Sequence, residues 1–284
     1  MNLILICSLY DPVSVQATSI IKSMLHFQEV TQPLHGSTSS YILIQDKEGY
    51  EDAHTHTVQL LEFSKRIVDI DSLDSFSADL IVFISRHASK SKINIFSVHA
   101  LGNWSGEALL GGKPNQISVS SPYNMRKMLL LLKKHNTTDI DVIYEATHHG
   151  PLLNTPSFFV EFGGDPESAS NEKCIRILAE SVAEFAENFA LSTNTADRNE
   201  KVAVGIGGGH YAKKFTELAM SGQYAFSHII PKHSADELDM ISQAVSKSDQ
   251  KADVIVLEWK SLNSFQKKGL IEKVSELGIS YEKI

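Results

Sequence analysis

Four short hydrophobic runs in this chain are each followed within a few residues by histidine. The runs are Leu80–Ile84, Ile93–Val98, Ile140–Tyr144 and Val202–Ile206. Short β-branched runs separated by helical patterns are typical of buried parallel strands, and open α/β sheets bind ligands beyond the carboxyl ends of their strands. The pattern therefore predicts an enzyme site in which several histidines converge at one sheet edge. They are His87, His99, His148, His149 and His210.

Helical patterns alternate with these strands over most of the chain. We expect helices over about Val13–His26 and Ser170–Phe189, and a third that begins at Ser121-Pro122. A last strand, Asp253–Glu258, precedes a helix that stops at Gly278. This alternation predicts an α/β fold with a mixed, mostly parallel sheet flanked by helices. Residues 1–284 form either one α/β hydrolytic domain or two closely joined lobes.

Composition limits the cellular context. The 284 residues are 42% hydrophobic, which is enough for a substantial core. The two cysteines, Cys7 and Cys174, are expected to be core residues in a reducing compartment, because two thiols make no disulfide framework. The first residues lack the basic flank of a signal peptide, and no run has the length of a membrane span. We therefore expect a soluble, cytoplasmic protein.

The formal net charge of −8 argues against a DNA-binding protein or a large nonspecific nucleic-acid surface. A local basic patch is compatible with this charge. Arg86 lies in the first histidine segment and Lys213 follows His210, so both cations gather beside the histidines if the strand ends share an edge. The alternative is that these are solvated charges scattered over an acidic surface.

The segment Glu145–Pro151 carries adjacent histidines, followed by a carboxylate in an apolar run. Neighbouring strand residues point to opposite faces, so His148 and His149 serve one site only if the chain has already left the strand. Otherwise one of them only bonds a carbonyl. Glu161 lies between aromatic residues, where an unpaired carboxylate is costly to bury. It requires a metal, a histidine or a lysine, in a site or in a structural ion pair.

The glycine-rich segment Gly205–Tyr211 allows two interpretations. Glycines let main-chain N–H groups approach an anion, although the Walker A lysine spacing is absent. Alternatively, the turn brings His210 and the strand end close to a substrate. After His99, Asn103 can donate to a carbonyl, and Trp104 either stacks on substrate or covers core. His228 and His233 are second-tier candidates. Ser85 has no Gly-x-Ser-x-Gly elbow, so a serine hydrolase is not expected.

Six segments, in this order, resemble the archaeal and plant type of D-aminoacyl-tRNA deacylase. They are Ser8–Ser14, Ser85–His87, Val98–Asn103, Thr147–Pro151, Glu161–Gly163 and Gly207–Tyr211. The ordered set spans the chain from its first strand and is more specific than any member. The resemblance implies hydrolysis of the ester that joins a D-amino acid to tRNA, an association with zinc, and a phosphorylase/hydrolase-like fold near peptidyl-tRNA hydrolases and zinc exopeptidases. Phe162-Gly163-Gly164 and Ser227 depart from the family pattern, which affects the fine shape of the pocket.

Zinc and the histidine pattern agree in chemistry, because zinc held by His and Glu with an open position lowers the pKa of bound water to about 7. Under the resemblance, we predict three sets of residues. The catalytic set is His148, Glu161 and His99; the metal set is His87, His149 and His210; the substrate-binding set is Arg86, Asn103, Gly208, Gly209, Tyr211 and Lys213. The tRNA 3′ end enters as a single strand held by stacking rings and local cations. The protein is expected to be a monomer or a small homo-oligomer.

Two other functions use the same residues. A zinc-dependent amidohydrolase or aminopeptidase-like enzyme would act on a free small molecule, so substrate profiles separate it from a deacylase. A non-catalytic tRNA- or nucleotide-binding module would use its histidines only on phosphate. Such a module purifies without stoichiometric zinc and hydrolyses nothing.

Overall fold

The computed structural model describes residues 1–44, 57–70, 73–89, 92–189 and 199–284. The chain divides into two compact units. The first unit contains Met1–Ser97, Leu131–Val142 and Phe159–Asp197, and the second contains Val98–Leu130, Ile143–Phe158 and Arg198–Ile284. Because three stretches of sequence build each unit, residues that are distant along the chain meet in one core. The two units are described separately below.

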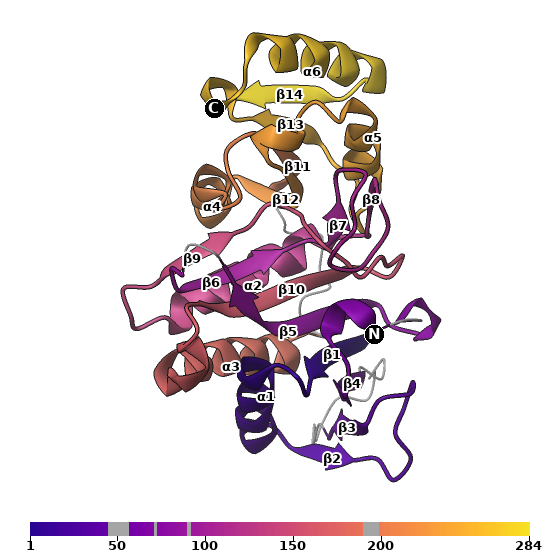
Figure 1. The fold of residues 1–284 in the computed structure, drawn as a ribbon, viewed down its shortest axis with the longest axis vertical. Helices are drawn as coiled ribbons and strands as arrows, with labels where there is room; N and C mark the ends of the chain where they lie inside the picture. Colours follow the sequence, from indigo (N-terminus) through magenta and orange to yellow (C-terminus); the bar gives the residue numbers. More distant parts are fainter. Residues whose placement is uncertain (45–56, 71–72, 90–91, 190–198) are drawn as a thin grey trace. The chain divides into compact units, whose positions relative to one another are not determined.

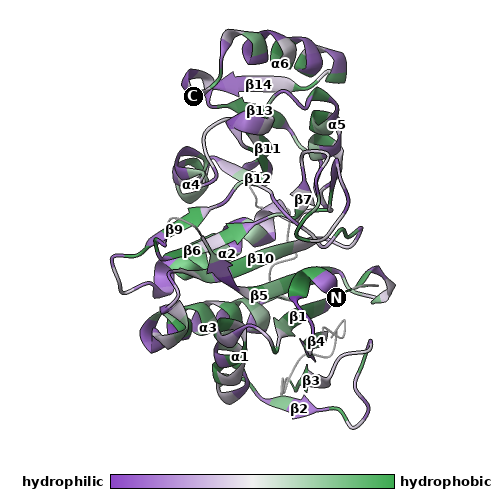
Figure 2. Ribbon diagram, in the orientation of Figure 1, coloured by the Kyte–Doolittle hydropathy of each residue, from purple (hydrophilic) through white to green (hydrophobic). Residues whose placement is uncertain are grey.

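The large sheet has eight strands in the order β2-β3-β4-β1-β5-β10-β6-β9. Their bounds are β1 Asn2–Ser8, β2 Phe27–Glu29, β3 Ser39–Leu43, β4 Thr57–Phe63, β5 Leu80–Ala88, β6 Ile95–His99, β9 Asp141–Tyr144 and β10 Ser157–Gly164. Strand β1 pairs in parallel with β4 and β5, whereas β3 is antiparallel to β2 and β4. The hydrophobic run of β1 is buried along Leu3–Cys7, and green strands mark this layer in Figure 2.

Helices α1 (Pro12–Met24) and α3 (Glu172–Glu187) lie side by side in the first unit (Figure 1). Helix α1 begins where predicted because Asp11 accepts hydrogen bonds from the main-chain N–H groups of Val13 and Ser14, and Pro12 occupies the first turn. Helix α3 buries an apolar stripe that includes Ile175, Leu178 and Val182, as its spacing predicts. The two cysteines are buried and free, so the prediction of core thiols is confirmed.

Two of the histidine-bearing strands extend further than their hydrophobic runs. Strand β5 continues through Ser85, Arg86 and His87 to Ala88, so His87 lies within the strand instead of in a following turn. Strand β5 has β1 and β10 as neighbours, and main-chain pairing on both sides can carry a strand through polar residues. His99 is likewise the last residue of β6.

The small sheet of the second unit has the order β12-β11-β13-β14, and its neighbouring strands are parallel. Its strands are β11 Lys201–Ile206, β12 Tyr224–Ile230, β13 Val254–Leu257 and β14 Ser280–Lys283. Its helices are α4 Lys213–Met220, α5 Leu238–Ser246 and α6 Ser264–Leu277. Helix α6 begins with an Asn263 capping box, and it ends at Gly278, which confirms the predicted end. The core of the second unit includes Val204, Ile255 and Leu270.

The expectation that the strand near Asp253–Glu258 is the last one was wrong, because β14 follows α6. Strand β14 has the sequence Ser-Tyr-Glu-Lys and lies at the edge of the sheet, largely exposed. An exposed edge strand needs no hydrophobic run, so its sequence carries no strand signal. The remaining elements are β7 Gly102–Asn103, β8 Gln116–Ile117 and α2 Pro122–His135, with short 3-10 helices Ile67–Asp69, Leu73–Ser75, Ser168–Ser170, Lys232–Ser234 and Trp259–Ser261.

The strands and helices give a mixed α/β architecture with parallel pairing at the centre of the large sheet, which confirms the predicted fold class. Among the described residues, no helix combines the length and the apolar character needed to cross a membrane.

Candidate active site

The loop after β9 brings two histidines to the end of β6. Main-chain hydrogen bonds hold this loop from Glu145 onward: the Glu145 N–H donates to Val98, the Ala146 N–H donates to His210, and the His149 carbonyl accepts from Gly102. His148 and His149 therefore lie beyond the end of β9, which meets the condition for both to serve one site. The loop is fixed by its neighbours and not only by its own sequence.

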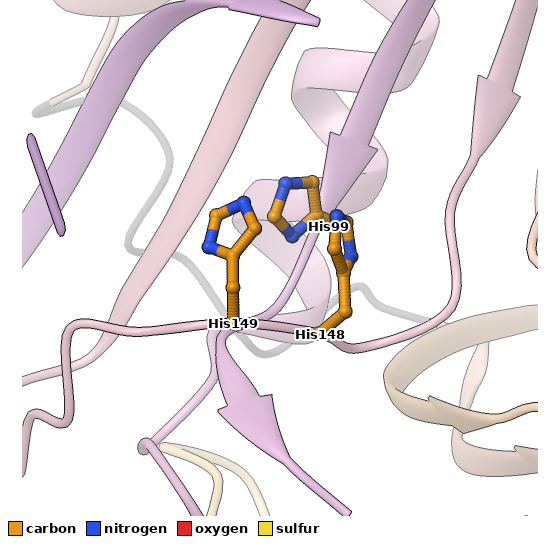
Figure 3. A group of neighbouring side chains, drawn as sticks. All are labelled: His99, His148 and His149. Carbon is orange, nitrogen blue, oxygen red and sulfur yellow. The ribbon is translucent and has the colours of Figure 1, made fainter. Parts of the chain in front are cut away.

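Three imidazoles gather at this point (Figure 3). The ring centroid of His99 lies 4.1 Å from that of His148 and 5.0 Å from that of His149, and the last two are 4.4 Å apart. One possible ligand nitrogen from each ring lies within 4.8 Å of the other two. Three nitrogens at this spacing can bind a single ion.

Main-chain carbonyls orient all three rings. Each Nδ1 lies within hydrogen-bond distance of a carbonyl oxygen: 3.1 Å from His99 to Ala100, 2.8 Å from His148 to Ala146, and 2.8 Å from His149 to Gly150. A carbonyl oxygen only accepts, so each Nδ1 carries the proton and donates. A neutral ring protonated at Nδ1 carries its lone pair on Nε2, and histidines that bind metal commonly donate their other ring N–H to a carbonyl in this way. The donor set fits zinc.

Burial favours the neutral form of His148. The His99 side chain is fully buried, and His148 and His149 are partly buried. Desolvation is the largest cause that holds the pKa of His148 well below its usual value, and the neighbouring His99 and His149 act in the same direction. Neutral imidazole is the form that binds metal, so the lowered pKa of His148 favours ligation by this residue near neutral pH.

A buried carboxylate adjoins the cluster. Glu145 is 1% exposed, and its Oε2 lies 2.6 Å from Nε2 of His210 and 3.9 Å from Nε2 of His148. These three residues form a second group whose possible ligand atoms lie within 4.8 Å of one another. The site of the second unit therefore combines four of the predicted histidines with a glutamate.

The glycine-rich turn carries His210 to this carboxylate. Gly208 has a φ of +70° and donates its N–H to Ser261 Oγ at 2.8 Å, whereas Gly209 has open space around the position of a side chain. Tyr211 pairs with Glu145 in an isolated bridge, and Lys213 begins α4 on the exposed surface. The predicted substrate-binding residues Gly208, Gly209, Tyr211 and Lys213 thus flank His210 in one unit.

In the first unit, Glu161 has hydrogen-bond partners in Ser85 and His87. Glu161 Oε1 accepts from Ser85 Oγ at 2.5 Å, and its Oε2 lies 3.3 Å from Nδ1 of His87. All three side chains are buried, so the carboxylate has the histidine partner that its apolar surroundings require. The main-chain N–H of Arg86 donates to Asp11 Oδ2 at 2.6 Å. Burial raises the pKa of Asp11, and Glu161 acts in the same direction.

The model of the family described as D-aminoacyl-tRNA deacylase matches residues 74–282. The chain belongs to this D-aminoacyl-tRNA deacylase family. The D-aminoacyl-tRNA deacylase of Pyrococcus furiosus is 33% identical over 280 residues, which cover 95% of this chain and 98% of that protein. The one from Pyrococcus abyssi is 37% identical over 217 residues, 76% of this chain and 77% of that protein.

A solved structure supports the fold of this deacylase-family chain. It is the crystal structure of a conserved protein of unknown function, with a TM-score of 0.80 and 26% identity, and the match covers 100% of this chain and 95% of that one. The resemblance inferred from the six ordered segments is therefore confirmed at the level of the family. The chain therefore belongs to a family of enzymes.

Two further candidates of this deacylase-family chain, Trp104 and His228, form hydrogen bonds inside the fold. Trp104 is 5% exposed in the core of the second unit, and its indole N–H donates to the Thr147 carbonyl at 2.6 Å, so it covers core. His228 lies between Thr147 Oγ1 at 3.2 Å and the Lys247 carbonyl at 2.8 Å, and burial lowers its pKa to about 4. Both support the loop that carries the histidines. His233 is exposed.

Sequence reasoning missed Glu145. The residue opens the Glu145–Pro151 segment, three positions before His148, but only the histidines of that segment stand out as candidates. Its signal was position: a carboxylate directly after a buried strand must find a cationic or hydrogen-bonding partner. The partner, His210, is 65 residues away in sequence, and spacing cannot show such a pair.

Proposed function

We propose that this chain hydrolyses the ester that joins a D-amino acid to tRNA, and that the imidazoles of His99, His148 and His149 hold a zinc ion for this reaction. The family match supports the reaction, and the three Nδ1 anchors support the metal. The anchors carry the metal proposal because a ring whose Nδ1 donates to a carbonyl binds a metal through Nε2, and one nitrogen of each ring lies within 4.8 Å of the other two.

A bound zinc ion would supply Lewis acidity to the ester carbonyl and to water. The protein's own part in the reaction is orientation and proton transfer. Because Glu145 Oε2 lies 2.6 Å from His210 Nε2, that nitrogen carries the proton in a neutral ring, and Nδ1 of the exposed His210 can accept a proton from attacking water and return it to the leaving ribose oxygen. The burial of Glu145 excludes water from its carboxylate and favours a partner that shares a proton.

Five other predicted residues keep their predicted roles in the proposal: Lys213, Tyr211, His87, Glu161 and Arg86. Lys213 and Tyr211, beside His210, are proposed to contact the tRNA 3′ end through charge and stacking. His87 as a ligand, Glu161 as a catalytic carboxylate and Arg86 as a phosphate contact rest on the family resemblance and on the buried His87–Glu161 pair. A cytoplasmic location and a monomeric or small homo-oligomeric state are likewise proposed.

The decisive test combines metal analysis with two substrate classes. The purified protein is assayed for bound zinc, and its turnover of D-aminoacyl-tRNA is followed after chelation and after zinc is restored. We expect stoichiometric zinc, loss of turnover on chelation and recovery on zinc addition. Cleavage of D-aminoacyl amides or peptides with none of the tRNA ester would instead favour the amidohydrolase. Full turnover in zinc-free protein would contradict the metal proposal.

A further inference from the structure

One peptide group in the second unit has both of its polar atoms bound by the same loop. This peptide joins His149 to Gly150. Its carbonyl oxygen accepts from the N–H of Gly102 at 2.7 Å, and its N–H donates to the carbonyl of Leu110 at 3.0 Å. Residues 102–112, which we call the latch loop, therefore grip the peptide from two sides.

The grip matters because of the backbone conformation of His149. His149 has a φ of +42°, in the left-handed region that non-glycine residues seldom adopt. Such a conformation costs about 1–3 kcal/mol and persists only where surrounding contacts impose it. The ring of the same residue donates from Nδ1 to the Gly150 carbonyl at 2.8 Å. The direction of the ring thus depends on where this part of the backbone lies.

Asn103 closes the latch loop on itself. Its side-chain nitrogen donates to the carbonyls of Gly111 at 3.0 Å and Lys113 at 3.3 Å. An asparagine amide has two N–H groups, so Asn103 can donate to Gly111 within the loop and to Lys113, the residue that follows it. The side chain bends the segment so that the Leu110 carbonyl faces the N–H of Gly150.

Two glycines bring the latch loop into close contact with Gly150. A Cβ on Gly150 would lie 2.2 Å from the main-chain nitrogen of Gly112. A Cβ on Gly112 would lie 2.8 Å from the Asn103 side-chain nitrogen and 3.2 Å from the Cα of Gly150, and its φ of +76° also disfavours a side chain. Glycine at both positions lets the two backbones touch.

We infer that the latch loop holds His149 in its left-handed conformation and so aims its Nε2 at the shared ion, with Asn103 as a positioning residue. The direction of Nε2 toward an ion rests on the proposed function, whereas the effect of the latch loop on the conformation of His149 does not. Asn103 acts through the Leu110 carbonyl and the His149–Gly150 peptide, and not by contact with substrate. Metal affinity depends on such supports, and losing one typically costs about 10–100-fold.

The chain offers two matched pairs of variants. Asn103→Ala removes the donors that close the loop, and its control is Gln243→Ala, which removes an amide that donates to Asn115 of the neighbouring segment at 3.0 Å. Gly112→Ala adds a methyl group against Gly150, and its control is Gly106→Ala in the same loop, where a Cβ meets nothing within 4 Å. Circular dichroism and thermal unfolding establish that each variant is folded.

Two readouts are measured on the full chain. In metal-free protein, hydrogen exchange of the Gly150 amide and the imidazole nitrogen shifts of His149 report the latch. We expect faster exchange and shifted nitrogens in Asn103→Ala and Gly112→Ala only. In a titration with Co²⁺, absorption reports affinity and ligand geometry, and we expect about 10–100-fold weaker binding in the same two variants, with both controls within about twofold of the parent.

The outcomes separate the latch from the metal proposal. Parent-like Gly150 exchange in both test variants would overturn the latch, whatever the metal data show. Faster exchange with unchanged Co²⁺ affinity and spectrum would overturn the positioning of a ligand. A parent protein that binds no Co²⁺ would contradict the metal part of the proposed function, and amide exchange and nitrogen shifts would then decide on the latch alone.

Discussion

The buried carboxylate of Glu145 lies 2.6 Å from Nε2 of His210, a side chain that is 43% exposed. The pair joins the end of β9 to the glycine-rich turn after β11, and both residues belong to the second unit. The Glu145 carboxylate is buried, whereas the His210 ring reaches solvent. This asymmetry suits a proton that moves between an excluded carboxylate and an entering substrate.

The first prediction concerns a substitution that removes the charge of the Glu145 carboxylate. Glu145→Gln keeps the shape of the side chain, so we expect a folded protein in which kcat for the ester falls by about 100-fold or more, as for loss of a general acid or base. The matched control is Glu184→Gln, because Glu184 also bonds a histidine, His135, at 2.7 Å, but in the first unit. Glu145→Gln activity within twofold of the parent would exclude this role.

The second prediction concerns the three imidazoles. His148→Ala and His149→Ala each remove one of three nitrogen ligands, and we expect neither variant to retain zinc after dialysis, because two ligands hold the ion far more weakly. The variants should remain folded, since both side chains are only partly buried. His233→Ala, an exposed histidine of the same unit, should keep parent zinc content. Stoichiometric zinc in both cluster variants would remove these residues from the metal site.

The third prediction is that alanine has different effects at two neighbouring glycines of the turn, Gly208 and Gly209. A side chain on Gly208 would meet Glu258 Oε2 at 2.4 Å and would have to adopt a φ of +70°. We expect Gly208→Ala to lose about 1–2 kcal/mol of unfolding free energy and much of its activity, because the turn carries His210. Gly209→Ala meets open space and should keep the stability of the parent. Equal effects of the two substitutions, measured by urea unfolding and initial rates, would refute the close approach at Gly208.

The fourth prediction is a loss of stability in mild acid that arises at His228. The pKa of His228 is about 4 in the folded protein, because of burial, and about 6.5 in an unfolded chain. Above pH 6.5 the ring is neutral in both states. Between pH 6.5 and pH 4 only the unfolded chain takes up the proton, so the free energy of unfolding falls by about 3 kcal/mol from this group.

Urea unfolding at several pH values between 7 and 4 measures this effect. We expect His228→Gln to show a shallower decline of unfolding free energy over that range than the parent, because glutamine does not titrate there. His233→Gln removes an exposed histidine and should decline as the parent does. An identical decline in His228→Gln and the parent would show that another group is responsible.

Local sequence signals predicted most of the helices and the buried strands. Asp11-Pro12 predicted the start of one helix and Gly278 the end of another, because caps depend on residues within one turn. Hydrophobic runs predicted β5, β6, β9 and β11 for the same local reason. The extension of β5 through His87 depends on neighbouring strands, and β14 depends on pairing at a sheet edge, so neither has a local signal.

The candidate site was predictable in residue type and only partly in arrangement. The predicted histidines His99, His148 and His210 meet, but not at the edge of a single sheet, because β6 and β9 belong to the large sheet and β11 to the small one. The partnership of Glu145 with His210 and the grip of residues 102–112 on the His149–Gly150 peptide involve main-chain geometry and distant segments. No spacing rule contains that information.

The measurement that tests the central claim most directly is the deacylation rate of tRNA charged with either enantiomer of one amino acid. Both substrates are presented to the zinc-loaded protein at equal concentration, with His149→Ala and zinc-free parent protein as references. We expect the D-ester to be cleaved about 100-fold faster than the L-ester or better, because a clash or an unpaired polar group discriminates by at least that much. Equal cleavage of the two enantiomers, or unchanged D-ester cleavage in His149→Ala, would contradict the account.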